Sequence, residues 1–309
     1  MKKKLTFARF KQYIPLYIML IPGFLYFFVN NYIPMVGITV AFKKFIPSRG
    51  IFGSEWSDPL FKNFEYLFST NDAAVIIRNT MLYNIAFILI NMFVGIVLAL
   101  FISDVANKRM KKLYQSSILL PFLMSIVVVS YIVFALLSHE NGMMNNSILP
   151  FLGMDKVQWY NDTTWWPLII IIVNCWKGVG YGALIYIAAI AGIDKSFYEA
   201  AELDGANKWQ QICKITLPCL VPAIITLLIM SVGRIFYSDF GLFYQVPQNS
   251  GSLFQVTNTI DTYVYRALMS SGGVGKSSAA GALQSIVGFT LVMSTNAIVR
   301  KLSNENAIF

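Results

Sequence analysis

The chain has 309 residues, of which 56% are hydrophobic and only 13% are charged. Soluble domains are about 45–50% apolar and roughly 25% charged, so this composition excludes an ordinary soluble domain and indicates a membrane protein. The net charge of +9 does not require nucleic acid, because a chain that crosses a membrane several times needs basic cytoplasmic loops. Three cysteines without a metal-ligand spacing and a single histidine leave little for catalysis or metal binding.

Six apolar stretches are long enough to cross a bilayer, since about 20 apolar residues span its hydrocarbon core as a helix. The first stretch follows a basic N-terminal segment. It lacks the short apolar core and the small-residue cleavage site of a removable signal peptide, so we expect it to be retained. The predicted spans are residues 14–42, 75–102, 118–137, 166–191, 219–237 and 279–299.

Lysine and arginine are distributed unequally between the two sides of these spans. With the N-terminus inside, the inner segments hold 14 of the 24 basic residues and the outer segments hold seven. The positive-inside rule then predicts a multi-pass membrane protein with both termini in the cytoplasm. We divide the chain into an N-terminal part with the first helix and an outer loop (1–74), a transmembrane domain (75–300) and a cytoplasmic tail (301–309).

A polar segment interrupts the apolar pattern after the fourth span, on the cytoplasmic side. Residues 195–204 predict a short helix with an apolar face that starts at Phe197 and can pack on the membrane portion. Asp194 is a suitable N-cap, and Gly205 permits a backbone turn that a side chain would resist.

A second helix is predicted directly after this turn. Trp209, Ile212, Cys213 and Thr216 fall on one face of it. Pro218 is expected in the first turn of the next span, where proline is tolerated. The segment is therefore predicted to be a bent pair of helices that offers acidic side chains to the cytosol.

The sequence of this segment resembles a known signature. Glu-Ala-Ala, three residues, Gly, nine residues and Ile-x-Leu-Pro is similar to the motif of the membrane subunits of binding-protein-dependent ABC importers. The flanking WKGVGYGALIYIAAIAGIDKSFYEAAELDGA resembles sugar permeases, and DFGLFYQVP, IDTYVYRAL and IVRKLSNENAIF resemble the polysaccharide and oligosaccharide branch of Gram-positive bacteria. The motif positions are Glu199, Ala200, Ala201, Gly205, Ile215, Leu217 and Pro218.

The resemblance implies an all-α polytopic membrane protein with six transmembrane helices, the type I ABC importer (MetI-like) fold. In that family, the element at residues 195–217 is a cytoplasmic coupling helix that sits in a groove of a separate ATPase subunit. Glu202 and Asp204 extend the acidic surface of the motif and are predicted coupling residues as well. The chain would be the permease subunit in the plasma membrane, and would move oligosaccharides or polysaccharide fragments across it by alternating access without being an enzyme.

The same resemblance implies a set of partners. These are a second permease subunit, expected to be a different chain, two cytoplasmic ATPase subunits and an extracellular lipoprotein that binds the solute. ATP and Mg²⁺ would belong to the ATPase subunits, and no cofactor is expected in this chain. Membrane lipid and the oligosaccharide complete the expected partners, and nucleic acid is not among them.

One segment looks like a nucleotide-binding loop. Residues 272–278 read GGVGKSS, but a phosphate-binding loop needs a glycine five residues before Gly275, and that position is Ser270. We therefore predict an outer turn that leads into the last span, and the ATPase must be another chain.

Polar residues on the apolar spans predict a hydrated pathway, although amides and small residues also serve helix packing. A charge at the bilayer centre costs about 2.5–3.5 kcal/mol on insertion scales, so Lys177 should face water or a partner. The glycines that follow it suggest a local helix break, and a structural role for Lys177 stays open. A cation in the pathway could favour acidic saccharides. The predicted pathway residues are Asn84, Asn91, Asn174, Lys177, Tyr181 and Arg234, the last near the outer end of the fifth span.

Two other classes of membrane protein are alternatives. A self-sufficient secondary transporter of a small polar solute is the main alternative, yet the two halves of the chain do not match as inverted repeats would. An intramembrane protease would need a Ser–His or paired-Asp arrangement, whereas His139 falls in an outer loop.

Overall fold

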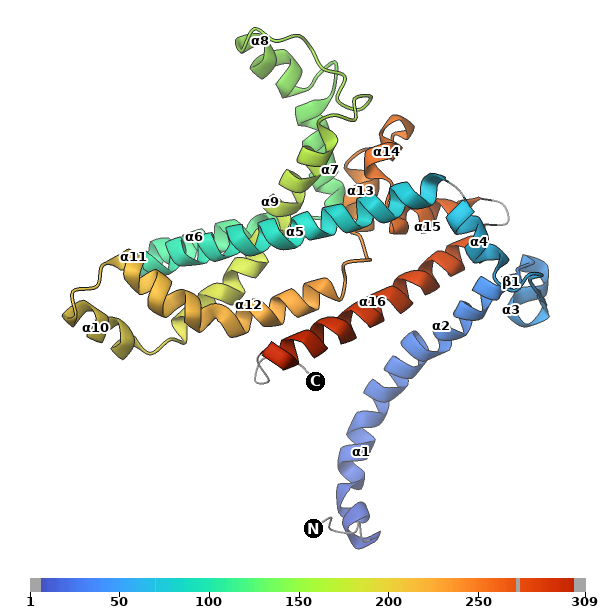
Figure 1. The fold of residues 1–309 in the computed structure, drawn as a ribbon, viewed down its shortest axis with the longest axis horizontal. Helices are drawn as coiled ribbons and strands as arrows, with labels where there is room; N and C mark the ends of the chain where they lie inside the picture. Colours follow the sequence, from blue (N-terminus) through green and yellow to red (C-terminus); the bar gives the residue numbers. More distant parts are fainter. Residues whose placement is uncertain (1–6, 70, 271–272, 303–309) are drawn as a thin grey trace. The chain divides into compact units, whose positions relative to one another are not determined.

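A computed structural model describes residues 7–69, 71–270 and 273–302 (Figure 1). Five helices in this part are long and apolar enough to cross a membrane, and helices α6 and α7 together qualify as a sixth span bent by 92°. The predicted all-α architecture follows from these helices. The five ranges are Tyr13–Phe42, Ala73–Asp104, Trp166–Ala191, Lys208–Val232 and Val274–Lys301.

The chain forms two compact units. The first comprises Met1–Leu67 and Ala267–Ala282, and its core contains Ala41, Ala279 and Ala282 with Phe42 and Phe64 packed against them. Four helical segments follow one another without a gap and make the first apolar span. The elements are α1 (Phe7–Phe27), η1 (Phe28–Tyr32), α2 (Ile33–Met35), η2 (Val36–Phe42), β1 (Lys43–Lys44), η3 (Pro47–Arg49), α3 (Gly50–Gly53), β2 (Glu55–Trp56) and α4 (Lys62–Ser69).

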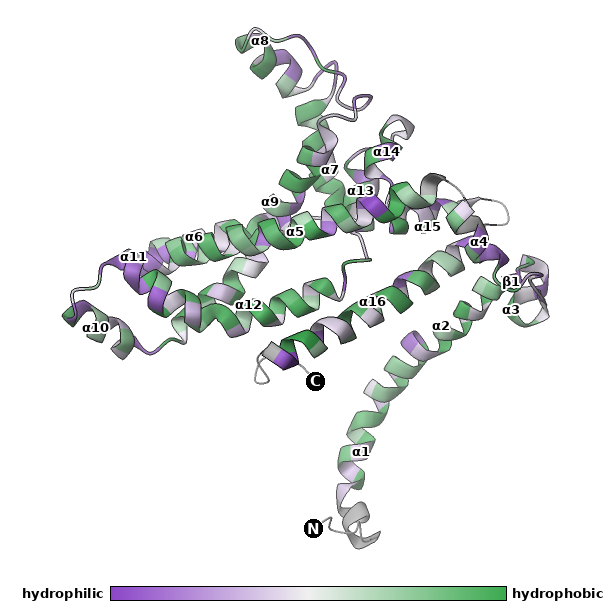
Figure 2. Cartoon of the chain, in the orientation of Figure 1, coloured by the Kyte–Doolittle hydropathy of each residue, from purple (hydrophilic) through white to green (hydrophobic). Residues whose placement is uncertain are grey.

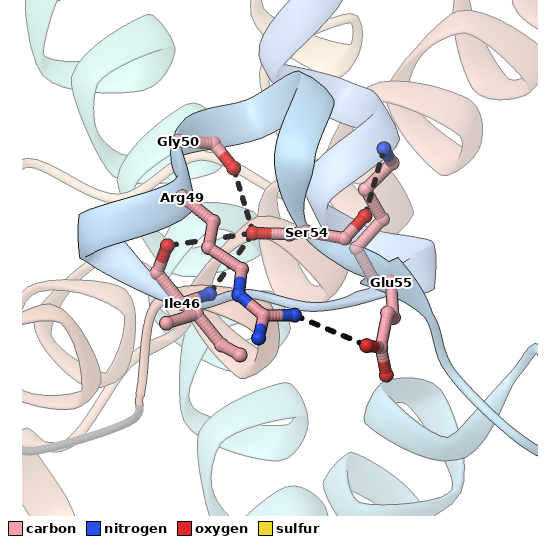
Figure 3. A network of polar contacts seen from close by, with 6 residues as sticks. Ile46, Arg49, Gly50, Ser54 and Glu55 are labelled. Carbon is pink, nitrogen blue, oxygen red and sulfur yellow. Dashed lines mark hydrogen bonds and ion pairs between the residues drawn. The ribbon is translucent and has the colours of Figure 1, made fainter.

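The loop after the first span folds into a small compact knob that no helix pattern predicted. Strands β1 and β2 pair in antiparallel fashion, two residues each. Between them, the Ser54 hydroxyl donates to the Gly50 carbonyl at 2.6 Å and accepts from the Ile46 amide at 3.0 Å (Figure 3). Arg49 and Glu55 form an exposed ion pair at 3.1 Å. These contacts satisfy backbone groups of a loop that has little regular structure.

The second unit comprises Phe68–Arg266 and Leu283–Phe309. Hydrophobic residues run along its long helices, whereas polar residues gather at the α10 and α11 end (Figure 2). The elements are α5 (Asn71–Asp104), α6 (Lys108–Leu123), α7 (Ile126–Leu137), η4 (Met144–Ile148), α8 (Leu149–Phe151), α9 (Trp166–Ala191), α10 (Lys195–Leu203), α11 (Lys208–Gln211), η5 (Ile212–Thr216), α12 (Leu217–Val232), α13 (Phe240–Gln245), η6 (Gly251–Leu253), α14 (Phe254–Thr257), α15 (Ile260–Met269) and α16 (Val274–Leu302), the last of which continues from the first unit.

The predicted third span, residues 118–137, is not one straight helix. Helix α6 ends at Leu123, and Met124 has an extended backbone with ψ 138°. The Ser125 hydroxyl then accepts from the Val127 amide at 3.4 Å and caps the start of α7. A serine before a run of apolar residues is a helix start signal, and hydrophobicity alone hides it.

The predicted fifth span, residues 219–237, is wrong at both ends. The continuous helical stretch starts at Lys208 and ends at Val232. Pro218 lies in the first turn of α12, as predicted, but α11 and η5 extend the stretch before it. The π-helical segment η5 ends two residues before Pro218 and accommodates it. The same arrangement recurs where η1 precedes Pro34 and η4 precedes Pro150. Proline lacks an amide donor and its ring clashes with the preceding turn, and a wider π turn relieves both problems.

The segment between α7 and α9 is organised by Asn145, which is fully buried. Its side-chain oxygen accepts from the Trp159 indole at 2.9 Å and from the Val157 amide at 3.2 Å. The Trp166 indole donates to the Trp159 carbonyl at 2.6 Å and ties this segment to the first turn of α9. Trp159 and Trp166 belong to the main apolar cluster of the second unit.

Helices α6 and α9 cross closely at Gly180. A Cβ atom built on Gly180 would overlap the carbonyl oxygen of Ile118. One residue further on, the Tyr181 ring stacks on Phe122 with centroids 5.1 Å apart. Helix α9 runs unbroken from Trp166 to Ala191, so the local break predicted after Lys177 is wrong. The glycine at 180 serves close helix packing instead.

The substitution Gly180→Ala tests this crossing. The added methyl group forces α6 away from α9, and overpacking of this kind costs about 1–3 kcal/mol. We expect a lower thermal unfolding midpoint for the purified protein in detergent.

Gly182→Ala is the matched control, because no atom lies within 4 Å of a Cβ built there. Equal midpoints for the two alanine variants would contradict the crossing as described.

Candidate functional site

The polar segment after α9 forms the predicted bent pair of helices. Asp194 caps α10, with its carboxylate accepting from the Ser196 amide at 2.9 Å. Hydrogen bonds from Ser196 lower the pKa of the Asp194 carboxyl below its usual value. Gly205 ends the helix with φ +76°, a left-handed conformation that favours glycine. Asn207 and Gln210 then form a capping box at the start of α11. We name residues 194–211 the hairpin.

The apolar side of the hairpin does not pack against the rest of the described chain. Phe197 is 58% exposed, Trp209 72% and Leu203 91%. The Tyr198 hydroxyl does reach the body of the protein, and it lies 2.9 Å from the Thr216 hydroxyl in η5. Exposed apolar side chains on a well-capped helix indicate a surface that another chain covers.

The motif residues are divided between this surface and the helix that follows. Ile215 and Leu217 are half-buried at the start of the continuous helix, as is Ala201 on α10. The exposed motif residues are Glu199, Ala200, Glu202, Asp204, Gly205 and Pro218.

A cavity of about 660 Å³ lies between α5, α9, α12 and the turn that follows α12. Five of the six predicted pathway residues line it together, although they come from segments far apart in the sequence. Polar stripes located these residues, whereas the apolar and aromatic parts of the lining carried no sequence signal. The five are Asn84, Asn91, Asn174, Tyr181 and Arg234; residues that sequence reasoning missed include Phe87, Met92, Tyr186, Met230, Tyr237 and Asp239.

The two central asparagines bond to each other across α5 and α9. The Asn91 amide donates to the Asn174 side-chain oxygen at 2.8 Å. The side-chain oxygen of Asn91 is buried and has no hydrogen-bond partner among the described residues. A buried unpaired acceptor beside a cavity is suited to a hydroxyl group, since leaving it unpaired costs about 1–3 kcal/mol.

Asn84 has a structural role in addition to lining the cavity. Its amide donates to the Ile235 carbonyl at 2.9 Å and to the Tyr237 carbonyl at 3.0 Å. It therefore fastens the segment after α12 to α5, and fixes the outer part of the cavity wall.

Lys177 does not line the cavity, contrary to our prediction. Its ammonium group donates to the Phe122 carbonyl at 3.1 Å and lies 5.7 Å from the centre of the Phe122 ring. Phe122 is in the last turn of α6, where carbonyl groups have no partner within the helix and a positive charge is favourable. Lys177 thus caps the C-terminus of α6 at the bend.

Arg234 lies in a turn, not in a span as predicted, because α12 ends at Val232. It is exposed, it lines the cavity, and its guanidinium group forms no hydrogen bond or ion pair within residues 7–69, 71–270 and 273–302. Asp239 lines the same cavity, and its carboxylate accepts from the Leu242 amide at 3.1 Å to cap α13. Further out, Asp261 accepts from the Ser238 amide at 2.6 Å.

The segment that resembles a phosphate loop is the start of a helix. Helix α16 begins at Val274, and the element before it is helix α15, not a strand. The first residue of the GGVGKSS segment, Gly272, lies outside the described residues. The strand–loop–helix context of a nucleotide site is missing from the described part.

These features define a class of protein: a polytopic helical membrane protein with a cavity between its helices, lined by polar and apolar side chains, and an exposed, capped hairpin. Residues 91–304 match the family described as binding-protein-dependent transport system inner membrane component. The chain belongs to this family. It is a membrane transport component, as the resemblance implied, and the family's dependence on a binding protein removes the alternative of a self-sufficient secondary transporter.

Individual relatives agree with this assignment. The chain is 34% identical to the polygalacturonan/rhamnogalacturonan transport system permease protein YteP of Bacillus subtilis, over 98% of this chain and 93% of that protein. It is 32% identical to the protein LplB of Bacillus subtilis, over 94% of this chain and 90% of that protein. Among solved structures, it is similar to a chain of a bacterial alginate ABC transporter in complex with an alginate pentasaccharide-bound periplasmic protein. That match has a TM-score of 0.86 and 32% identity, and covers 96% of this chain and 97% of that chain.

The role of Lys177 is tested by Lys177→Met. Loss of the ammonium group leaves the end of α6 uncapped, and we expect the thermal midpoint in detergent to fall by about 2–4 °C for each kcal/mol lost. Lys177→Arg keeps a cation and should retain most of the stability. If the methionine variant is as stable as the wild type but loses uptake of charged substrates, Lys177 acts on the substrate and not through the end of α6.

Proposed function

We propose that the chain is the permease subunit of an ATP-driven importer that carries oligosaccharides or polysaccharide fragments. The observation that carries the proposal is a cavity, lined by both polar and apolar side chains, whose wall, α12, continues without a break into the exposed hairpin. The named substrates of YteP and of the alginate transporter are polysaccharides, which supports a saccharide as the cargo.

The hairpin is the proposed site of coupling to a separate ATPase. Phe197, Leu203 and Trp209 offer apolar contact area, and the acidic residues orient the docked surface. Because Lys208–Val232 is one helix, a displacement of the hairpin passes directly into the cavity wall. The proposed coupling residues are Glu199, Ala200, Ala201, Glu202, Asp204, Gly205, Ile215, Leu217 and Pro218.

The cavity is the proposed pathway for the saccharide. Amide groups suit sugar hydroxyls, and the exposed ring of Tyr181 offers an apolar face for a sugar ring. Asn91, Asn174, Tyr181 and Arg234 are the proposed contacts. Two further residues support the pathway. Lys177 binds the end of α6 beside the cavity, and Asn84, in the lining itself, holds the segment after α12 in place.

The proposed arrangement in the membrane puts both termini and the hairpin in the cytoplasm. Helix α9 then connects the outer segment around Asn145 to the hairpin across the bilayer. A second permease subunit, two ATPase subunits that hold ATP and Mg²⁺, and an extracellular lipoprotein that delivers the saccharide complete the transporter. ATP-driven movement of the hairpin switches the cavity between outward-facing and inward-facing states.

Gly205→Val tests the coupling role. A β-branched residue strongly disfavours the left-handed backbone at this position, with a strain of about 1–3 kcal/mol that distorts the turn. In proteoliposomes with the whole transporter, we expect ATP-driven uptake to fall roughly ten-fold, with an unchanged amount of inserted protein.

Gly205→Asn is the matched control, because asparagine tolerates the left-handed region. It should retain most of the uptake. Wild-type uptake by the valine variant would show that the geometry of this turn is not needed for coupling.

A further inference from the structure

The cavity carries a cation that none of the described residues binds. Arg234 is exposed in the turn after α12, and its guanidinium group has no side-chain partner in the described part of the chain. We propose that Arg234 selects acidic saccharides by binding their carboxylate at the outer mouth of the cavity. This inference rests on the proposed function and adds the chemical class of the cargo.

The position of Arg234 along the pathway follows from the helix that precedes it. The helix Lys208–Val232 has 25 residues. It is about 37 Å long at 1.5 Å per residue, which exceeds the hydrocarbon core. Because this helix begins at the cytoplasmic hairpin, Arg234 comes at its outer end. A saccharide released outside the membrane meets this residue before it reaches Asn91 and Asn174.

Two charged residues of the described chain line the cavity, Arg234 and Asp239. Lys177 lies off the cavity and caps α6 through the Phe122 carbonyl. One carboxylate oxygen of Asp239 caps the first turn of α13 through the Leu242 amide. Arg234 is therefore the cation of the described lining that is left for an anionic ligand.

The chemistry of the free group fits a carboxylate. Guanidinium presents donors in a planar fork that matches carboxylate oxygens two at a time, and it stays ionised at any physiological pH. A saccharide of uronic acids carries one such carboxylate on each ring, so successive rings can present it to one fixed arginine. Tyr181 and the unpaired oxygen of Asn91, deeper in the cavity, are left for ring faces and hydroxyls.

The experiment measures initial ATP-driven uptake by the whole transporter in proteoliposomes, with its binding protein and labelled trigalacturonate. Arg234→Gln should lower uptake of trigalacturonate roughly ten-fold, since a hydrogen-bonded contact with a charged group is lost. Arg49→Gln is the matched control, because it removes the same charge from an exposed ion pair in the outer knob. It should transport at the wild-type rate.

A charge rescue separates the role of the charge from that of shape. In a background with Cys175, Cys213 and Cys219 replaced by serine, Arg234→Cys is treated from outside with a cationic or an anionic methanethiosulfonate reagent. The cationic reagent should restore most of the uptake, and the anionic reagent should not.

Three results would overturn the inference. The first is uptake of trigalacturonate by Arg234→Gln at the wild-type rate, and the second is an equal effect of the two reagents on Arg234→Cys. The third is that Arg234→Gln lowers uptake of the uncharged methyl ester of trigalacturonate as much as it lowers uptake of trigalacturonate.

A wild-type transporter that takes up neutral oligosaccharides but no trigalacturonate would also overturn the inference, while the proposed function would stand. A wild-type transporter that moves no saccharide with ATP would instead refute the proposed function.

Discussion

The crossing of α6 and α9 is the contact on which the membrane part depends. Helix α6 stops at Leu123 within an apolar stretch, and its last carbonyl groups have no partner within the helix. Lys177 donates to the Phe122 carbonyl from the neighbouring helix, and Gly180 lets the two backbones come close enough for that contact. The chain can then bend by 92° and place the segment around Asn145 beyond α7. Without Lys177, the Phe122 carbonyl at the bend would lose this donor.

The second mechanical feature is the continuous helix Lys208–Val232. Pro218 would normally break a helix at this point, and η5 absorbs it by widening one turn. The hairpin at one end and the cavity at the other are thereby joined by one rigid element. The contact between the Tyr198 and Thr216 hydroxyls also joins α10 to the widened turn itself. Prolines in η1–α2 and η4–α8 are accommodated in the same way, which makes this a recurrent device of the chain.

The chain by itself leaves large apolar surfaces uncovered. None of the apolar window in Tyr13–Phe42 is buried, and the hairpin exposes Phe197, Leu203 and Trp209. The first surface suits lipid or a neighbouring membrane helix. The second lies on polar, capped helices that do not resemble a span, and suits a protein partner. A subunit built in this way depends on its assembly for part of its stability.

The sequence alone determined the class of the protein, the membrane helices apart from one bend and the ends of two spans, and the hairpin with its Asp194 cap and Gly205 turn. These features depend on local hydrophobicity, capping and backbone preference, which the order of residues contains. It also located five residues of the cavity, since polar side chains in an apolar span are conspicuous. Only the tertiary structure decided which charge is free. The sequence predicts both Lys177 and Arg234 as pathway cations, one near mid-span and one near the outer end of a span. In the structure the end of α6 meets Lys177 and a cavity meets Arg234, because contacts between distant segments fix the partner of each charge.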